Sequence, residues 1–333
     1  MITDARVLRD EFIPREVVHR DPEIQQLAST LEPLAGEEDK AQNSFIYGPP
    51  GTGKTCITRH TLERLSEENI ELKWQYINCW ENYNRFKALY KALEGIGKTL
   101  DVHRQSTPTD ELFTRLKNYD ERPYVLIMDE VDQLEDEKVL YDLYSLPNVT
   151  LIMIANKETA FHNMDERVRS RLMGADRLEF ESYSPDELTD ILEDRAEWGL
   201  RPGSIDRPRL RKIALSAEGD ARIAIGILRS AARKAEKQDS DEITREMIQE
   251  SVPDAKDNVR QKNVEKLTKH QKKLYDIIQD EGDIRPGDLY EKYRDQVDEP
   301  RSDRMLRKYL NKMVHYNLID AEGEGRWRRY KAK

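Results

Sequence analysis

Residues 48–55, Gly-Pro-Pro-Gly-Thr-Gly-Lys-Thr, have the types and the spacing that a phosphate site requires. They fit the pattern G-x-x-x-x-G-K-[ST], whose glycines let backbone N–H groups approach the phosphates without obstruction by side chains. The helix expected after them turns its N-terminus, with its partial positive charge, toward the same anion. Lys54 can reach the β- and γ-phosphates, and the Thr55 hydroxyl can ligate Mg²⁺. The expected ligand is therefore a nucleoside triphosphate.

Two adjacent carboxylates, Asp129 and Glu130, close the apolar run YVLIMDE. Asp129 is expected to hold Mg²⁺, directly or through water, and Glu130 to orient and deprotonate the attacking water. The alternative is an acidic helix start. Asn156 closes the further run LIMIAN and is expected to position the same water, with a turn-forming Asn as the alternative.

Arginines follow at two places in the chain. In the stretch DERVRSRL, Arg167 and Arg171 are four residues apart and therefore share one face of a helix. Arginine is suited to the charge of a γ-phosphate in phosphoryl transfer, and a surface ion-pair face is the alternative. Arg222 lies one turn into a later helix, from where it can return over the nucleotide.

A set of alternating strands and helices must position these groups. Strands are expected at 44–48, 72–79, 123–130, 149–156 and 176–180. Helical patterns are found between them, at 54–67, 83–99, 109–119, 135–144 and 165–172. This alternation predicts a parallel sheet covered on both faces, and the unbroken apolar runs VLIM and LIMIA are typical of central strands. Residues 1–180 are thus expected to form an α/β nucleotide-binding domain.

The remainder divides into three segments. Residues 181–251 are expected to be all-helical, beginning with Ser184 as N-cap and Pro185 at the first helical position. Residues 252–266 are polar and contain a proline, and we expect a linker. Residues 267–333 predict three helices and a hairpin around Gly323-Glu-Gly325, which is a winged-helix pattern.

Composition limits the class of protein. The chain has 333 residues, of which 37% are hydrophobic and 36% charged, with a net charge of −10. No apolar run of about 18 residues and no apolar signal core are present, so we expect a cytoplasmic protein without a membrane partner. Residues 301–333 hold 10 basic and 4 acidic side chains, a net +6 within an acidic chain. This asymmetry favours a C-terminal contact with nucleic acid, and a solvated tail is the alternative.

Several of these stretches, taken in order, resemble one family. GPPGTGKT and DEVD look like the Walker A and B motifs of an AAA+ ATPase, and Asn156 matches its sensor 1 position. RVRSRL resembles the arginine-finger segment and GDARIAIGILRSA the sensor 2 helix. The opening from Phe12 to Glu23 and the stretch LTKHQKKLYDII are similar to the archaeal origin-recognition initiators, relatives of the origin recognition complex and its helicase-loading partner. The resemblance covers nearly the whole chain.

The resemblance implies an AAA+ domain, a helical lid domain and a winged-helix domain. It implies that the chain binds ATP or ADP with Mg²⁺, marks replication origins on double-stranded DNA and helps to recruit the replicative helicase. Slow ATP hydrolysis would act as a switch. The implied catalytic residues are Glu130, Asn156, Arg171 and Arg222. Arg171 would act on a neighbouring molecule when the protein assembles with further copies or with paralogues. The implied nucleotide-binding residues are Pro14, His19, Gly48, Pro49, Pro50, Gly51, Thr52, Gly53, Lys54, Thr55 and Cys56.

DNA contacts are expected from the C-terminal segment. A recognition helix at about 301–316 would enter the major groove, and the arginines after the hairpin turn would follow the minor groove or the backbone. Members of the family also touch DNA with an insertion before the Walker B strand, here at about 84–119. The expected contact residues of the winged helix are Arg301, Ser302, Arg304, Arg307, Lys308, Arg326, Arg328 and Arg329.

Two other functions remain open at this stage. One is a DNA-binding regulator that uses nucleotide structurally, with little turnover. The other is a clamp-loader-like subunit, which the basic C-terminal winged helix disfavours.

Overall fold

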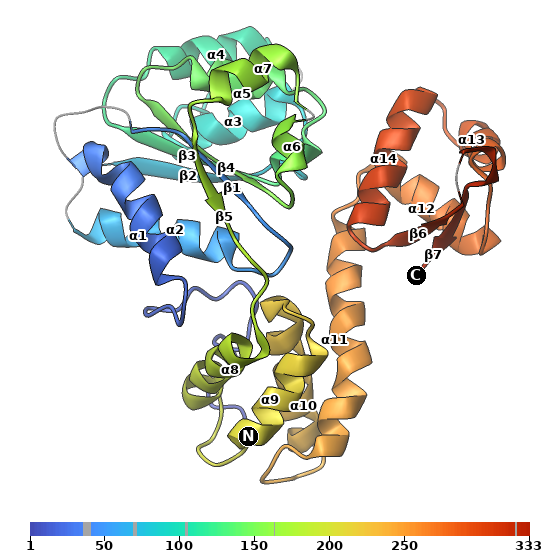
Figure 1. Cartoon of the computed structure of the whole chain (residues 1–333). Coiled ribbons are helices and arrows are strands. Elements are labelled where there is room, and N and C mark those ends of the chain that lie inside the picture. The colour runs from blue at the N-terminus through green and yellow to red at the C-terminus, as the bar shows by residue number, and fades with distance from the viewer. Residues whose placement is uncertain (36–40, 69–71, 104–105, 163, 324) are drawn as a thin grey trace. The chain divides into compact units, whose positions relative to one another are not determined.

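The computed structural model describes residues 1–333 except 36–40, 69–71, 104–105, 163 and 324. The chain folds into two compact units, Met1–Val252 and Pro253–Lys333 (Figure 1). The first unit contains both the sheet and the helices of the expected lid. Within the described residues, no helix combines the length and the apolar character needed to span a bilayer.

A five-stranded parallel sheet organises the first unit, in the order β2-β3-β4-β1-β5. Its strands are β1 (Ser44–Tyr47), β2 (Lys73–Asn78), β3 (Tyr124–Asp129), β4 (Val149–Ala155) and β5 (Asp176–Glu179). All five strands expected from the sequence are confirmed. Every residue of β3 and β4 is buried, as their unbroken apolar runs predict for strands covered on both faces.

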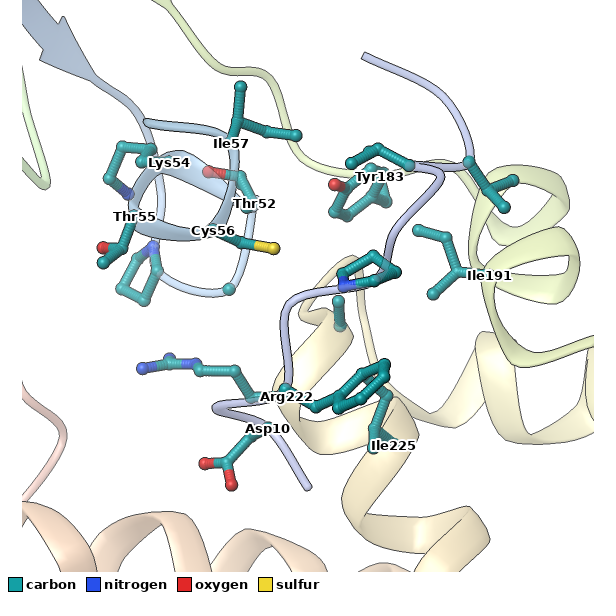
Figure 2. A pocket seen from close by; sticks show the side chains of 18 of the residues that line it. Asp10, Thr52, Lys54, Thr55, Cys56, Ile57, Tyr183, Ile191, Arg222 and Ile225 are labelled. Carbon is teal, nitrogen blue, oxygen red and sulfur yellow. The ribbon is translucent and has the colours of Figure 1, made fainter. Parts of the chain in front are cut away.

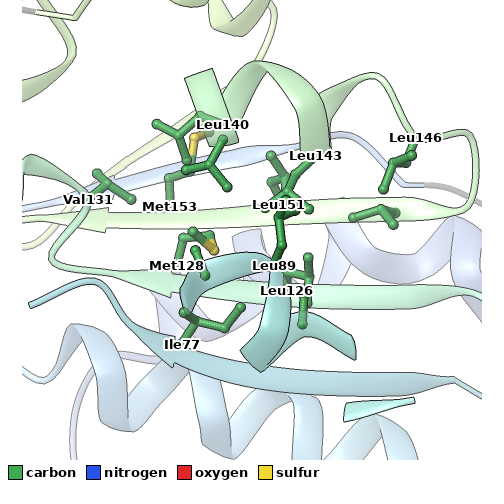
Figure 3. Close-up of a cluster of buried hydrophobic side chains, with 14 of the residues drawn as sticks. Ile77, Leu89, Leu126, Met128, Val131, Leu140, Leu143, Leu146, Leu151 and Met153 are labelled. Atoms are coloured by element: carbon green, nitrogen blue, oxygen red, sulfur yellow. The ribbon is translucent and has the colours of Figure 1, made fainter. Parts of the chain in front are cut away.

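Helices cover both faces of the sheet, because alternate residues of each strand point to opposite sides. Leu126 and Met128 of β3 pack with one set of helices: α3 (Arg85–Gly95), α4 (Thr109–Lys117), α5 (Lys138–Tyr144) and α7 (Glu166–Leu172) (Figure 3). Val125 and Ile127 pack with α1 (Asp21–Leu31) and α2 (Lys54–Glu67) on the other face. Each fully buried aliphatic side chain contributes about 1.5–3 kcal/mol.

Three short elements complete the sheet-containing part: η1 (Glu32–Ala35), η2 (Val131–Gln133) and α6 (Thr159–His162). Neither α1 nor α6 was among the helices expected from the sequence. The parallel sheet and its intervening helices bring the carboxyl ends of β1, β3 and β4 to one edge, where the loops carry the candidate residues.

Three helices follow the sheet: α8 (Pro185–Gly199), α9 (Arg207–Ser216) and α10 (Ala221–Lys237). Ser184 caps α8 as expected, since its hydroxyl accepts from the Glu187 N–H and the Glu187 carboxylate accepts from the Ser184 N–H. Asp220 caps α10 by accepting from the N–H groups of Arg222 and Ile223. Buried residues on facing sides of these helices form a small helical bundle.

The segment expected as a linker, 252–266, is helical up to Glu265. Helix α11 (Arg245–Glu265) begins inside the segment expected to be all-helical, 181–251, and continues through Pro253. The buried residues Ile248, Ser251 and Ala255 recur at helical spacing through the proline. Proline removes one N–H and disfavours the helix interior, but this periodic stripe carries the helix past it.

The second unit contains the three helices and the hairpin expected from the sequence. They are α12 (Lys269–Glu281), α13 (Pro286–Asp295), α14 (Asp303–His315), β6 (Ile319–Glu322), η3 (Gly325–Trp327) and β7 (Arg329–Ala332). Strands β6 and β7 pair antiparallel, and Ile284 adds a bridge to Tyr330. Leu274, Leu289, Leu306 and Leu310 are buried, so this unit has a core of its own.

Candidate functional site

The loop between β1 and α2 has a backbone that favours glycine. Gly51 and Gly53 adopt φ values of 75° and 92°, in the left-handed region. A Cβ on Gly51 would lie 1.9 Å from Oδ1 of Asp220, the cap of α10. The loop therefore comes too close to the helical bundle to tolerate a side chain. Gly53 is the N-cap of α2, so the loop ends at a helix N-terminus.

Lys54 is the buried cation of this loop, with 6% of its surface exposed. Its Nζ donates hydrogen bonds to the carbonyl oxygens of Gly48 and Pro49, at 2.7 and 2.6 Å. Burial lowers the pKa of Lys54 to about 8, while the neighbouring Asp129 carboxylate opposes that shift. The ammonium is thus fixed in position but incompletely compensated, which favours an anionic ligand.

Asp129, at the end of β3, is held by three donors. Its Oδ2 accepts from the Thr55 hydroxyl at 2.7 Å and from the Tyr76 hydroxyl at 3.0 Å, and its Oδ1 accepts from the Glu130 N–H at 2.8 Å. Burial, together with the Asp129 charge, raises the pKa of Tyr76, so this hydroxyl stays protonated and remains a donor. Glu130 has φ of 57°, a left-handed backbone that turns the chain sharply after the strand.

A cavity of about 210 Å³ opens beside this cluster (Figure 2). Its polar end is lined by Lys54, Thr55, Asp129, Glu130 and Asn156, which brings together the residues expected for phosphate, metal and water. In Figure 2, Ile191 and Ile225 lie across the cavity from the phosphate loop. The apolar lining residues are Phe12, Pro14, Val17, Val18, Ile57, Ile191 and Ile225. The cavity therefore has one end suited to phosphates and one suited to a base.

The N-terminal segment, residues 1–18, supplies part of the apolar end. The guanidinium of Arg195, on α8, donates to the carbonyl oxygens of Val7 at 2.9 Å and Phe12 at 3.2 Å and lies 4.9 Å from the centre of the Phe12 ring. The N–H of Thr3 also donates to Gly199. Hydrogen bonds thus attach this segment to the helical bundle, although it is far from α8 in sequence.

Arg20 links the two segments that connect the sheet with the helical bundle: the one that precedes α1 and the one between β5 and α8. It donates to the Glu181 carbonyl oxygen at 2.6 Å and to Glu23 at 2.7 Å. Its guanidinium lies 4.2 Å from the centre of the Tyr183 ring. His19 and Arg20 both have positive φ, 66° and 75°, which strains two successive non-glycine residues.

Arg222 lines the cavity from α10 and points toward its polar end (Figure 2). The guanidinium donates to both carboxylate oxygens of Asp220, at 3.2 and 2.7 Å. Burial disfavours the charge of Arg222, but the bonds to Asp220 outweigh it and raise the pKa. Arg222, which the sequence predicted for this site, is therefore present in the cavity lining and paired with Asp220.

Some expected nucleotide-site residues do not line the cavity. The His19 ring lies 3.0 Å from Oδ2 of Asp190 and is absent from the lining. Gly48 and Pro49 are also absent and contribute carbonyl oxygens to Lys54 instead. Arg171, on α7, is exposed and lies 5.5 Å from the centre of the Tyr141 ring, outside the lining. The lining does include Pro14, Pro50, Gly51, Thr52, Gly53 and Cys56.

The second unit presents most of the expected DNA-contact residues at its surface. Five of these residues, just before α14 or in its N-terminal half, have exposed side chains: Arg301, Ser302, Arg304, Arg307 and Lys308. Leu306, Leu310 and Met313 are buried, as expected for the inward face, while Met305 is half-buried. One face of α14 is thus cationic and accessible.

The arginines of the β6–β7 hairpin differ from that expectation. Arg329 donates from Nε to both carboxylate oxygens of Asp283, each at 2.8 Å, so it already has an anionic partner within the unit. Arg328 is half-buried. The side chain of Arg326 lies outside the described part of the structure. The hairpin therefore offers fewer accessible cations than its sequence suggests.

Three polar residues of the site were missed by the sequence reasoning. Tyr76 lies inside an expected strand, Arg195 inside an expected helix, and Asp220 was read only as part of a helix start. Each has an ordinary role at its own position, and only tertiary contacts bring it to the cavity. The available signal was the position of Arg195 on the apolar face of α8.

The residues present fit a magnesium-bound nucleoside triphosphate. The hydroxyl of Thr55 and the carboxylate of Asp129 are oxygen donors 2.7 Å apart in the cavity lining, the ligand type that Mg²⁺ prefers. The loop, the N-terminus of α2 and Lys54 form a cationic cradle beside them.

Comparison with known proteins agrees with this geometry. Residues 16–154 match the family described as AAA ATPase domain, and residues 189–252 match the family described as Cdc6 AAA+ ATPase-type lid domain. The ORC1-type DNA replication protein 1 of Halobacterium salinarum is 50% identical over 308 residues, covering 92% of this chain and 100% of the relative. The ORC1-type DNA replication protein 9 of the same organism is 46% identical over 331 residues, covering 99% of this chain and 93% of the relative.

A solved structure is similar along the whole chain. The Aeropyrum pernix ORC1 protein, solved in complex with DNA, superposes with a TM-score of 0.77 at 26% sequence identity. The match covers 100% of this chain and 93% of that one. A sheet-and-lid ATPase architecture, a matching lid and near-complete alignment to curated relatives lead to one assignment: the chain belongs to the family of ORC1-type DNA replication proteins.

Proposed function

We propose that this chain binds ATP with Mg²⁺ in the cavity and hydrolyses it slowly, and that the nucleotide state controls its action on DNA. The observation that carries the nucleotide part is the buried Lys54, fixed by two carbonyl oxygens beside a paired Thr55 and Asp129. The base would lie at the apolar end, against Ile191, Ile225 and the N-terminal segment.

The chain's own residues divide the work of hydrolysis. Glu130 would accept a proton from the attacking water, and Asn156 would hold that water in line with the γ-phosphate, since both side chains line the polar end. Magnesium bound at Thr55 and Asp129 would neutralise charge on the β- and γ-phosphates. Tyr76 would keep Asp129 oriented through the bond to Oδ2.

Two arginines would add charge to the γ-phosphate from different sources. Arg222 would reach it from α10 by exchanging its bonds to Asp220 for bonds to the phosphate. Arg171 is exposed and outside the cavity lining, so it would act on the nucleotide of a neighbouring molecule. Hydrolysis would then depend on assembly with a second copy or a paralogue.

The second part of the proposal concerns DNA. The chain would bind double-stranded DNA at replication origins with α14 in the major groove and the β6–β7 hairpin at the minor groove, as a winged helix. The exposed cationic face of α14 and the similarity to an ORC1 protein solved with DNA support this. The sheet domain would add contacts, and the assembled protein would help to recruit the replicative helicase in the cytoplasm, on the nucleoid.

Mapping the chromosomal sites of the protein by crosslinking and sequencing tests the DNA part. The comparison is between the wild-type chain, Arg304→Ala/Arg307→Ala and a control, Arg64→Ala, which removes an exposed arginine of α2. Sharp sites at replication origins that the double variant loses and the control keeps would support the initiator role. Scattered sites at promoters would favour a nucleotide-binding regulator. Absence of reproducible sites would refute specific DNA binding.

A further inference from the structure

The turn before α10 holds a carboxylate, that of Asp220, next to the phosphate loop. Gly219 has φ of 87°, and a Cβ there would lie 3.0 Å from the Cβ of Ser182, in the segment between β5 and α8. On the other side, the N–H of Ala221 donates to the carbonyl oxygen of Gly51 at 3.1 Å. The backbone around Asp220 is therefore confined between two other segments of the chain.

Asp220 and Arg222 differ in their freedom to move. Oδ1 of Asp220 caps α10 through the N–H groups of Arg222 and Ile223, and only 16% of the aspartate side chain is exposed. The Arg222 side chain is 38% exposed, has several rotatable bonds and lines the cavity (Figure 2). If the two side chains separate, the carboxylate stays in place and the guanidinium moves.

Both charges also act on the place where phosphates would bind. Burial is the main reason for the lowered pKa of Lys54, and the Asp129 carboxylate opposes it. The charge of Arg222 lowers the pKa of Lys54 further, and the charge of Asp220 opposes that effect. The aspartate thus offsets part of the positive charge that Arg222 adds beside the phosphate loop.

A second aspartate shows that capping alone does not require such a pair. Asp206 caps α9 by accepting from the Arg209 N–H at 2.9 Å. Nε of Arg209 lies 3.8 Å from Oδ1 of this aspartate, and its Nη1 donates to Glu242 at 3.0 Å. Neither residue belongs to the cavity lining. Asp220 has the same capping role but also bonds Arg222 with both oxygens at the edge of the site.

We propose that Asp220 sets how strongly the site prefers a nucleoside triphosphate over a diphosphate, by competing with the γ-phosphate for Arg222. This rests on the proposed nucleotide binding and adds a means of regulating it. While they are paired, the guanidinium and the carboxylate have no net charge, so a γ-phosphate gains little from Arg222 until the pair separates. A diphosphate lacks the group that would displace the carboxylate.

The free energy of separating the pair therefore opposes binding of the triphosphate only. Asp220 is in this sense a positioning residue, which acts on the nucleotide through Arg222. Loss of its charge should strengthen binding of the triphosphate, whereas loss of an aspartate that merely supports the fold should not.

The test measures the affinities of the full chain, with Mg²⁺, for ADP and for adenylyl imidodiphosphate, a triphosphate analogue that resists hydrolysis. Asparagine still caps a helix but carries no charge. We expect Asp220→Asn to bind the analogue about tenfold more tightly than wild type, with a much smaller change for ADP. In a chain that already carries Arg222→Ala, the same substitution should leave the ratio of the two affinities unchanged. The matched control Asp206→Asn should leave it unchanged as well.

Other outcomes separate the inference from the proposal on which it rests. An unchanged ratio in Asp220→Asn would reduce Asp220 to a helix cap, with nucleotide binding intact. Weaker binding of the analogue would mean that the carboxylate orients Arg222 toward the γ-phosphate, which overturns the competition. A changed ratio that persists without Arg222 would overturn it too. If wild type binds neither nucleotide, the proposed function fails first.

Thermal melting without nucleotide controls for misfolding. If Asp220→Asn melts well below wild type, Asp220→Ser repeats the measurement, because serine is also a good helix cap and carries no charge. Both neutral variants should prefer the triphosphate analogue more strongly than wild type does.

Discussion

The phosphate loop of the first unit and the β6–β7 hairpin of the second are both glycine-supported turns with nearby cations, yet they hold charge in opposite ways. Lys54 is almost fully buried and bonded to two carbonyl oxygens of its own loop. The cations around the hairpin and α14 are mostly at the surface, among them Arg304 and Arg307. A buried cation with fixed partners suits one small ligand, while exposed cations suit an extended polyanion.

This difference has an energetic basis. A charge in a poorly hydrated site interacts strongly with a ligand but makes its own ionisation costly, which appears as the lowered pKa of Lys54. A charge in water costs nothing to ionise and is screened by salt. Changes of pH, of salt concentration and of individual side chains should therefore affect the two regions differently.

The largest effect is expected for Glu130→Gln. The amide keeps the size of the side chain at the polar end of the cavity but cannot accept the proton of the attacking water. Turnover of ATP should fall by about 10²- to 10⁴-fold, with nucleotide affinity nearly unchanged. Steady-state hydrolysis and equilibrium nucleotide binding measure the two quantities, and a variant that hydrolyses ATP normally would exclude Glu130 as the base.

Lys54→Met should weaken nucleotide binding itself. It removes the charged donor while retaining the length of the buried stem, and the lost charge-assisted hydrogen bonds correspond to about 100-fold in affinity. Binding of the variant to DNA should be unaffected when no nucleotide is present. Calorimetric titration checks the first statement and anisotropy the second; an unchanged ATP affinity would contradict the role of the loop.

Arg304→Ala/Arg307→Ala should weaken DNA binding and leave nucleotide binding unchanged, the reverse of what is expected for Lys54→Met. Each lost phosphate contact should lower the slope of log affinity against log salt by about 1, so DNA binding weakens most at low salt. ATP affinity should stay as in wild type. Anisotropy titrations over a salt series provide the slope, with Arg64→Ala as control. A slope identical to wild type would place the DNA surface elsewhere on the chain.

Tyr76→Phe tests the orientation of Asp129. The change removes only the hydroxyl that donates to Oδ2, at 3.0 Å, and leaves the Thr55 bond. Because a hydrogen bond that orients a metal-binding carboxylate raises its affinity for the metal, about tenfold more Mg²⁺ should be needed for half-maximal hydrolysis. The measurement is the Mg²⁺ dependence of the rate, and no shift would mean that Thr55 alone orients the carboxylate.

The smallest effect is expected from pH. The pKa of Lys54 is lowered from 10.5 to about 8, so above about pH 8 the folded chain binds fewer protons than the unfolded chain. Stability of the nucleotide-free protein should therefore rise with pH between those two values, whereas ATP affinity should fall about tenfold from about pH 7 to about pH 9. Binding near pH 8 should take up a proton, which calorimetry in buffers of different ionisation enthalpy detects. Lys54→Met should show neither effect.

The sequence predicted the parts of this molecule whose function follows from local pattern. The five strands follow from apolar runs, and the phosphate loop from glycine spacing before a lysine. At Pro253 the polar stretch does begin the second unit, but the proline gave no indication that the stretch is helical, because buried residues continue the helical period through it. A local sequence pattern predicts structure reliably when a residue type has only one physical role in that pattern.

Contacts between distant segments were not predictable in this way. His19 is oriented toward Asp190 and Arg329 toward Asp283, and each partner is separated from it by many residues. Arg195 shares the apolar face of α8, but its partners, the carbonyl oxygens of Val7 and Phe12, are distant in sequence. A single sequence carries no record of such pairs, so the partners Asp190 and Asp283 could not be predicted for His19 and Arg329, whose roles toward nucleotide and DNA stay predictions.

The attachment of residues 1–12 to α8 has a consequence for the way the cavity can open. The apolar end is built by this segment together with α8 and α10, while the polar end belongs to the loops after β1, β3 and β4. Because Arg195 bonds Val7 and Phe12 to α8, a rotation of the helical bundle would carry this part of the apolar end with it, while Ile57 of α2 would stay with the polar end. Opening would therefore separate the contacts to the base from the contacts to the phosphates of a bound nucleotide. The part of the nucleotide that is held less tightly would lose its contacts first.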